Sequence, residues 1–94
     1  MKQIVISKYG GPDVLEVRDV EIPTPKPDEV LIKNHFSGVN FSEVMARMKL
    51  YPGAPKPPCT IGGECSGVIE SIGENVNELS VGQRVMAFSR FKSY

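Results

Sequence analysis

The chain has 94 residues and a mass of 10.3 kDa, which suits one small domain and excludes a dinucleotide-binding domain beside a separate substrate domain. Its 11 Lys and Arg residues balance its 11 Asp and Glu residues, so the sequence gives no electrostatic indication of binding to nucleic acid or to an anionic membrane. Hydrophobic residues make up 40% and charged residues 23% of the chain, a composition typical of a soluble globular domain.

The first strand is predicted over Lys2–Ser7, and the second over Leu15–Arg18, where apolar and charged residues alternate as in a half-buried strand. The turn-rich segment Lys8–Asp13 separates them, so we expect a hairpin. Ile22–Pro27 has proline at every second position, which no sheet interior tolerates because each proline removes a ladder donor. We therefore expect an extended connector there; a proline-rich ligand for a partner domain is the alternative.

The third strand is predicted over Glu29–Phe36, with Val30, Ile32 and Phe36 on one face. Two more strands are predicted later in the chain, over Cys65–Ile72 and Arg84–Phe88.

One helix is predicted, over Asn40–Met48. Asn40 is a good N-cap, and Glu43 three residues later completes a capping-box-like pair. The segment Tyr51–Pro58 that follows is a proline-rich loop. About five short strands around one short helix indicate a mainly β fold, a small and partly open β-barrel that forms a single domain over residues 1–94.

The two cysteines, Cys59 and Cys65, are too few for a zinc ribbon or a disulfide scaffold. The apolar run Ile4-Val5-Ile6 is too short for a signal peptide or a membrane span, so we expect reduced thiols and a cytoplasmic protein. A disulfide between the two cysteines is the alternative.

The motifs that would carry chemistry are incomplete. No G-x-G-x-x-G or G-x-x-x-x-G-K loop is present, and His35, the single histidine, is not a metal site by itself. Gly63–Gly67 matches a cysteine nucleophile elbow, but β-branched residues follow Cys65 and favour a strand over the helix that such an elbow requires. Arg90–Tyr94 interleaves basic and aromatic residues, yet five residues in a neutral chain are weak support for nucleic-acid binding.

Several stretches, in order and at matching spacings, resemble the medium-chain dehydrogenase/reductase superfamily. The resemblance is closest to the zinc-free, zeta-crystallin-like quinone oxidoreductase branch and, within it, the vesicle amine transport protein type. The stretches are Tyr9–Leu15, Ser37–Glu43, Arg47 with Leu50-Tyr51, Ile61–Ile69, Gly73 and Val81–Met86.

This resemblance implies the GroES-like N-terminal part of an alcohol-dehydrogenase-like catalytic domain, truncated before the Rossmann domain. It implies a parent protein that uses NADPH, without zinc, to transfer hydride to a quinone, an enone or a similar substrate. The 94-residue piece is then expected to bind no cofactor and to be inactive. A non-catalytic interaction module and an enoyl reductase of lipid or polyketide assembly are the alternatives, so whether the chain itself is an enzyme stays open.

The resemblance also implies site residues. Asn40 and Gly63 stand where zinc-dependent relatives have a cysteine and a histidine ligand, so no metal is expected. Asn40 and Tyr51 are expected to face nicotinamide and substrate, as is Met45, which stands where some relatives have a tyrosine. The alternatives are that Asn40 is a helix cap alone and that Tyr51 only packs in the core or the loop. The residues expected to give structural support are Glu43, Glu64, Gly62 and Gly63.

The end of the sequence also predicts an interaction. Phe88, Phe91 and Tyr94 continue an apolar pattern without a terminating turn. We therefore expect an open sheet edge and an uncovered face, and hence a homodimer or other self-association.

Overall fold

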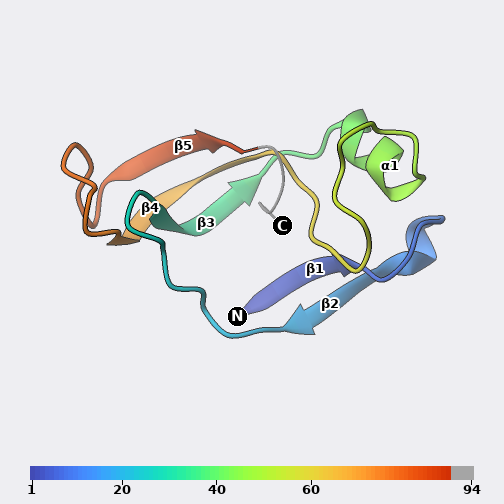
Figure 1. Cartoon of the computed structure of the whole chain (residues 1–94), viewed down its shortest axis with the longest axis horizontal. Helices are drawn as coiled ribbons and strands as arrows, with labels where there is room; N and C mark the ends of the chain where they lie inside the picture. Colours follow the sequence, from blue (N-terminus) through green and yellow to red (C-terminus); the bar gives the residue numbers. More distant parts are fainter. Residues whose placement is uncertain (90–94) are drawn as a thin grey trace.

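A computed structural model describes residues 1–89 of the chain (Figure 1). Its elements in chain order are β1 (Lys2–Ile6), the 3-10 turn η1 (Pro12–Val14), β2 (Leu15–Asp19), β3 (Val30–Ser37), α1 (Phe41–Arg47), β4 (Glu64–Ile72) and β5 (Arg84–Phe88). The predicted mainly β fold with one short helix is therefore confirmed. The expectations for Arg90–Tyr94, which include the apolar residues Phe91 and Tyr94, lie outside the described residues. Among residues 1–89 no helix is long and apolar enough to cross a membrane.

The predicted hairpin is confirmed, because β1 and β2 pair antiparallel from Lys2 opposite Asp19 to Ile6 opposite Leu15. Every residue of β2 is exposed, so the prediction that this strand is half-buried is wrong. The reason is that the hairpin is a two-stranded sheet of its own, and within the described chain β2 pairs with β1 alone.

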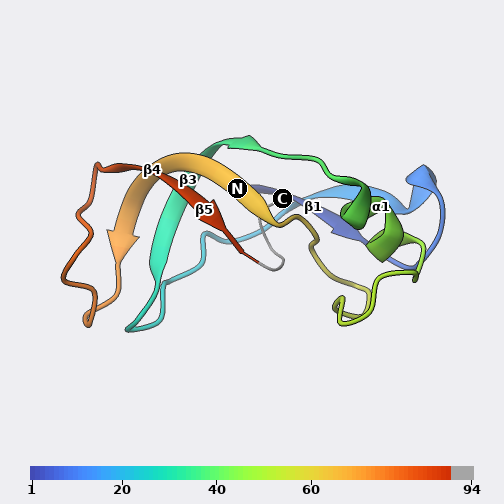
Figure 2. The ribbon, with the colours of Figure 1, turned by 90° about the horizontal axis from the view of Figure 1, so that it is seen from above.

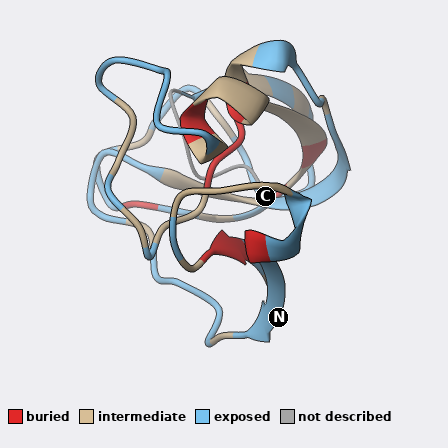
Figure 3. Cartoon of the chain, turned by 90° about the vertical axis from the view of Figure 1, so that its right-hand side faces the viewer, coloured by how far each residue is buried: buried red, intermediate tan, exposed pale blue. Residues whose placement is uncertain are grey.

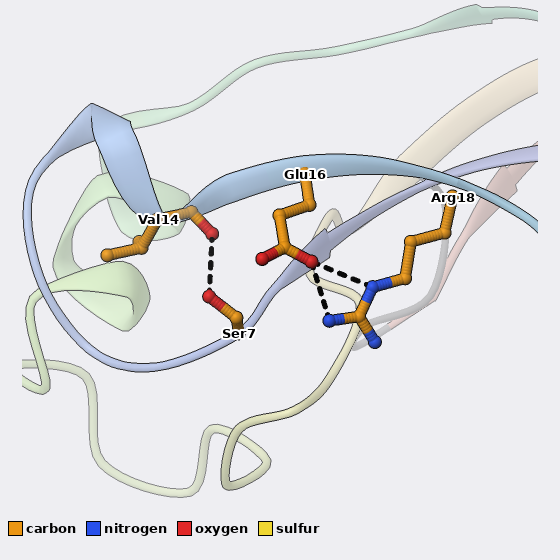
Figure 4. Close-up of polar contacts among 4 residues, drawn as sticks. All are labelled: Ser7, Val14, Glu16 and Arg18. Atoms are coloured by element: carbon orange, nitrogen blue, oxygen red, sulfur yellow. Dashed lines mark hydrogen bonds and ion pairs between the residues drawn. The ribbon is translucent and has the colours of Figure 1, made fainter.

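Figure 4 shows two polar contacts of this hairpin, one along β2 and one at the turn between the strands. The Arg18 guanidinium donates to Glu16 Oε2 from Nε at 2.8 Å and from Nη2 at 2.6 Å, and this contact lowers the pKa of Glu16. Ser7 Oγ donates to the Val14 carbonyl at 3.5 Å, where the turn joins β2. An exposed ion pair of this kind adds little to the stability of the hairpin.

The second sheet is antiparallel and has the order β3-β4-β5, so β3 and β5 are its outer strands (Figure 1). Figure 2 shows that β3 and β4 arch strongly rather than lying flat. The β3–β4 ladder has two irregularities, and at the second of them His35 is an extra residue between Asn34 and Phe36. Such a bulge reverses the faces of the residues that follow it. Phe36 is 76% exposed, and the prediction that it shares a face with Val30 and Ile32 is wrong.

The hydrophobic core lies where the hairpin meets α1 and the loop before β4. Its buried members are Ile6, Val14, Ala46 and Ile61, with Ala54 and Cys59 packed against them. Backbone hydrogen bonds tie the same parts together: Ile6 exchanges two with Cys59, at 2.9 and 3.2 Å, and the Gly10 N–H donates to the Arg47 carbonyl at 3.0 Å. Figure 3 shows buried positions on β1 and on the helix, with exposed chain around them. The helix is therefore anchored on its core side, which fixes where its first residue lies.

The proline-rich connector forms no strand, as predicted, and closes one end of the second sheet. The Gly73 N–H donates to the Glu29 carbonyl at 2.7 Å, and the Asn75 N–H donates to the Pro27 carbonyl at 2.9 Å. A Cβ at Gly73 would collide with the carbonyls of Lys26 and Pro27. Glycine is therefore required where β4 ends against the connector.

Candidate functional site

Asn40 lies between β3 and α1 and is the N-cap of the helix, with an extended backbone at φ −117° and ψ 162°. The Glu43 carboxylate accepts the Asn40 backbone N–H at 2.8 Å and the Ser42 hydroxyl at 3.3 Å. Glu43 is only 8% exposed, so these donors satisfy a carboxylate that is largely removed from water. The capping-box contact that the sequence predicts is present, and it fixes the backbone of Asn40.

The side chain of Asn40 has a second carboxylate partner. Its Nδ2 donates to Glu64 Oε1, on the first residue of β4, at 3.3 Å. The carboxylate of Glu64 occupies the space above Gly38, where any Cβ would collide with it. Asn40, Glu64 and Gly38 are thus brought together from β4 and from the segment that joins β3 to α1.

The other two residues expected to face substrate lie further along the chain. Met45 is half-buried in α1, and its carbonyl accepts the Leu50 N–H at 2.8 Å. Tyr51 begins the loop after the helix and is 42% exposed. Between them Lys49 adopts the left-handed conformation at φ 65°, which turns the chain out of the helix. That Met45 and Tyr51 face a substrate stays a prediction.

The two glycines before β4 hold the strand that carries Glu64. Gly62 is buried and has φ 115°, a conformation that side chains rarely allow. The Gly63 carbonyl accepts the Ser89 N–H at 2.7 Å, which ties the start of β4 to the end of β5. Glu64 therefore projects from backbone that is fixed on both sides.

The cysteine motif does not form a nucleophile elbow. Cys65 lies inside β4, which continues without a turn to Ile72, whereas an elbow needs a turn and a helix directly after the nucleophile. Cys59 and Cys65 are both free thiols, and burial raises the pKa of each, which is the opposite of activation. In the part of the chain that the structure describes, no three His, Cys, Asp or Glu side chains are grouped as metal ligands.

Sequence reasoning named Asn40, Glu43 and Glu64 separately but missed the contact between Asn40 and Glu64. These two residues are 24 positions apart, and only the return of β4 beside β3 brings them together. Gly38 is the local signal that could have indicated it, because a glycine just before the helix leaves room for a side chain from elsewhere.

The hairpin, the three-stranded sheet and the helix α1 with its N-cap Asn40 form the architecture of a GroES-like domain. The chain belongs to the alcohol dehydrogenase GroES-like domain family, whose model matches residues 26–93, and through it to the medium-chain dehydrogenase/reductase superfamily.

Curated relatives agree with this family. The chain is 40% identical over 90 residues to the synaptic vesicle membrane protein VAT-1 homolog of Danio rerio, an alignment that covers 95% of the chain and 19% of the relative. It is 41% identical over 90 residues to the quinone oxidoreductase of Rattus norvegicus, covering 95% of the chain and 27% of the relative. The chain thus spans between 19% and 27% of the length of these relatives.

Solved structures share the fold. The human synaptic vesicle membrane protein VAT-1 homolog-like protein matches with a TM-score of 0.96 at 33% identity, over 100% of the chain and 30% of that structure. The Escherichia coli quinone oxidoreductase complexed with NADPH matches with a TM-score of 0.89 at 30% identity, over 95% and 27%. The CurK enoyl reductase matches with a TM-score of 0.83 at 28% identity, over 96% and 30%.

Proposed function

We propose that this chain forms the substrate side of a zinc-independent, NADPH-dependent reductase that transfers hydride to a quinone, an enone or a similarly activated double bond. The observation that carries the proposal is Asn40 at the start of α1, whose backbone N–H is held by Glu43 and whose side chain is held by Glu64. The named quinone oxidoreductases among the relatives support the reaction class, and the Escherichia coli enzyme complexed with NADPH supports the cofactor.

The donor set at this position supports a site without zinc. Catalytic zinc usually has three protein ligands, most of them histidine nitrogens or cysteine sulfurs, and a water or substrate in the fourth position. Asn40 and Gly63 provide neither a thiolate nor an imidazole, and Glu64 provides a carboxylate that already accepts a hydrogen bond from Asn40. An amide and a carboxylate by themselves are poor zinc ligands.

The chemistry we assign to Asn40 is orientation of the substrate. One amide hydrogen points to Glu64, which leaves the other hydrogen free to donate to a carbonyl oxygen of the substrate. A donor fixed in advance stabilises the negative charge that grows on such an oxygen when a hydride is added to the conjugated carbon. We assign a second donor to the phenol of Tyr51, at the start of the loop after the helix.

The residues of this chain do not provide a complete cofactor site. The sequence has no glycine-rich loop that would hold the NADPH diphosphate, so the chain by itself is expected to be inactive. Calorimetric titration of the 94-residue chain with NADPH tests this point. Binding of NADPH with a micromolar Kd would contradict the expectation that the isolated chain binds no cofactor and is therefore inactive.

The test of the function itself uses the longest protein that the gene encodes. We expect NADPH-dependent reduction of 1,2-naphthoquinone, and we expect Asn40→Ala to lower kcat/KM about a hundredfold, the usual effect of losing one oxyanion donor. Asn77→Ala is the matched control, because it removes an exposed asparagine outside the site and should leave the rate unchanged. An active protein with an unimpaired Asn40→Ala variant would contradict the role of Asn40.

Two alternatives have their own support. The VAT-1 homologs among the relatives support a module that acts by interaction, and such a protein should show no turnover with any quinone. The CurK match supports an enoyl reductase, which should prefer a thioester-linked enoyl group over a quinone. Comparing crotonyl thioester with 1,2-naphthoquinone separates these alternatives. The predicted cytoplasmic location and the truncation of a longer domain stay predictions.

We also propose that the chain self-associates through one face of the second sheet. Phe36, Met86 and Phe88 are 76, 89 and 86% exposed, and the strand register places them on the same face. The same face carries Glu64 at one end and Arg84 at the other. A second copy related by a two-fold axis that lies between the two faces and runs perpendicular to the strands would bring each Glu64 opposite the Arg84 of its partner.

Light scattering over a wide concentration range tests this association. We expect a dimer that Met86→Lys converts to a monomer, because a charge at the centre of the apolar face opposes its burial. Val17→Lys, on the exposed strand of the hairpin, is the matched control and should leave the dimer intact. A wild-type chain that stays monomeric at high concentration would contradict the proposal, whatever the outcome for the reductase function.

A further inference from the structure

The orientation of the Asn40 side-chain amide is decided by the chemistry of its partner. The structure places Nδ2 of Asn40 at 3.3 Å from Oε1 of Glu64. An ionised carboxylate accepts hydrogen bonds and cannot donate them, whereas an amide donates through nitrogen and accepts through oxygen. If the amide were turned by 180°, two acceptor oxygens would face each other. Glu64 therefore selects one of the two amide orientations.

We propose that Glu64 is a positioning residue for Asn40. Glu64 holds the side-chain amide of Asn40 so that the amide oxygen and one amide hydrogen remain directed away from β4. The functional consequence rests on the proposed function, in which the free amide hydrogen meets a substrate oxygen. The positioning itself is a property of this chain and can be measured without any reaction.

Two further features of the structure fit this role. The backbone of Asn40 is fixed independently, because Glu43 accepts its N–H at 2.8 Å, and the reciprocal capping contact from the Glu43 N–H to the Asn40 side chain is compatible with Nδ2 pointing to Glu64. Gly38 provides the space for the Glu64 carboxylate, and a methyl group there would collide with that carboxylate rather than with backbone. Gly38→Ala should therefore displace the Glu64 side chain while the strands stay in place.

The direct test is nuclear magnetic resonance of the 94-residue chain labelled with 15N asparagine. The chain has four asparagines, and Asn75 serves as an internal reference because its Nδ2 donates to Asp28 Oδ1 at 3.0 Å. We expect the Asn40 side-chain amide to show the chemical shift of a hydrogen-bonded amide, as Asn75 does, in contrast to the exposed Asn77. Single substitutions of the asparagines assign the signals.

The variants separate positioning from a merely structural role. Glu64→Gln should keep the hydrogen-bonded shift of the Asn40 amide, because the glutamine oxygen can still accept. Glu64→Ala and Gly38→Ala should move the signal to that of a free asparagine. Glu43→Gln is the matched control and should leave the hydrogen-bonded shift of the Asn40 side chain in place. A wild-type signal at the shift of a free asparagine, or one unchanged in Glu64→Ala, would overturn the proposal.

A kinetic arm distinguishes failure of this inference from failure of the proposed function. In the longest protein that the gene encodes, Glu64→Ala should lower kcat about ten- to a hundredfold with a small change in KM, and Glu64→Gln should recover most of the loss. An unaffected Glu64→Ala variant beside an impaired Asn40→Ala variant refutes the positioning role in catalysis. If Asn40→Ala is itself unimpaired, the proposed function fails, and the amide chemical shifts alone decide whether Glu64 holds Asn40.

Discussion

Removal of the Glu43 carboxylate should destabilise the fold, because this carboxylate is nearly buried and holds the start of the helix. It accepts the Asn40 backbone N–H at 2.8 Å and the Ser42 hydroxyl at 3.3 Å. Glu43→Ala leaves the Asn40 N–H without this acceptor, whereas Glu43→Gln keeps an acceptor oxygen and loses the charge.

The magnitude follows from the two contacts. A hydrogen bond to a charged group contributes about 1.5–3 kcal/mol, and loss of a helix cap costs about 0.5–2 kcal/mol, so we expect Glu43→Ala to lose about 2 kcal/mol. Glu43→Gln should lose about 1 kcal/mol or less, since the neutral amide still accepts. A domain of this size has a free energy of unfolding of about 5–14 kcal/mol, so the alanine variant should remain folded.

Urea unfolding followed by circular dichroism measures both values. The matched control is Glu78→Ala, which removes an exposed carboxylate and should change the free energy of unfolding by less than about 0.5 kcal/mol. If Glu43→Ala is as stable as this control, the capping contact does not stabilise the helix as argued. If Glu43→Gln loses as much free energy of unfolding as Glu43→Ala, the charge of Glu43 stabilises the fold and its hydrogen-bond acceptor does not.

Three further predictions concern the sheet and the thiols. Ile69 is 1% exposed, so Ile69→Ala should lose about 2–5 kcal/mol in urea unfolding and Ile69→Val about 1 kcal/mol; equal losses would contradict a packed site. Burial raises the pKa of Cys59 and Cys65, so both should react with iodoacetamide more slowly than free cysteine at neutral pH and faster as pH rises. For the same reason, the folded state should lose stability as pH rises through the raised pKa of these thiols. Gly73→Ala should lower the melting temperature by the equivalent of about 1–3 kcal/mol, because its methyl would collide with the Lys26 carbonyl; an unchanged melting temperature would show that the connector can move aside.

Local sequence signals predicted the elements well. The prolines of Ile22–Pro27 excluded a strand there, and the pair of Asn40 and Glu43 predicted the start of the helix at the correct residue. Both signals act through groups a few residues apart, so they need no knowledge of the fold.

Features that depend on distant chain were predicted poorly. The bulge at His35 arises from the pairing of β3 with β4, and it reversed the expected face of Phe36. The exposure of β2 follows from the separation of the chain into two sheets, which an alternating pattern cannot reveal. The contact between Asn40 and Glu64 has the same origin, because it forms only when β4 returns beside β3.

The uneven distribution of the core has a consequence for how the domain opens. Four of the buried apolar residues lie together where the hairpin, the helix and the loop before β4 meet. The three-stranded sheet contributes Ile69 on β4, while its other face exposes Phe36, Met86 and Phe88. Local stability follows buried apolar contact, so amide hydrogens of β5 should exchange by frequent partial opening and those of β1 only by rare global unfolding. β5, which pairs with Glu64 at the start of β4, therefore belongs to the least stable part of the domain. Contact with a neighbouring surface would reduce the opening of this strand most.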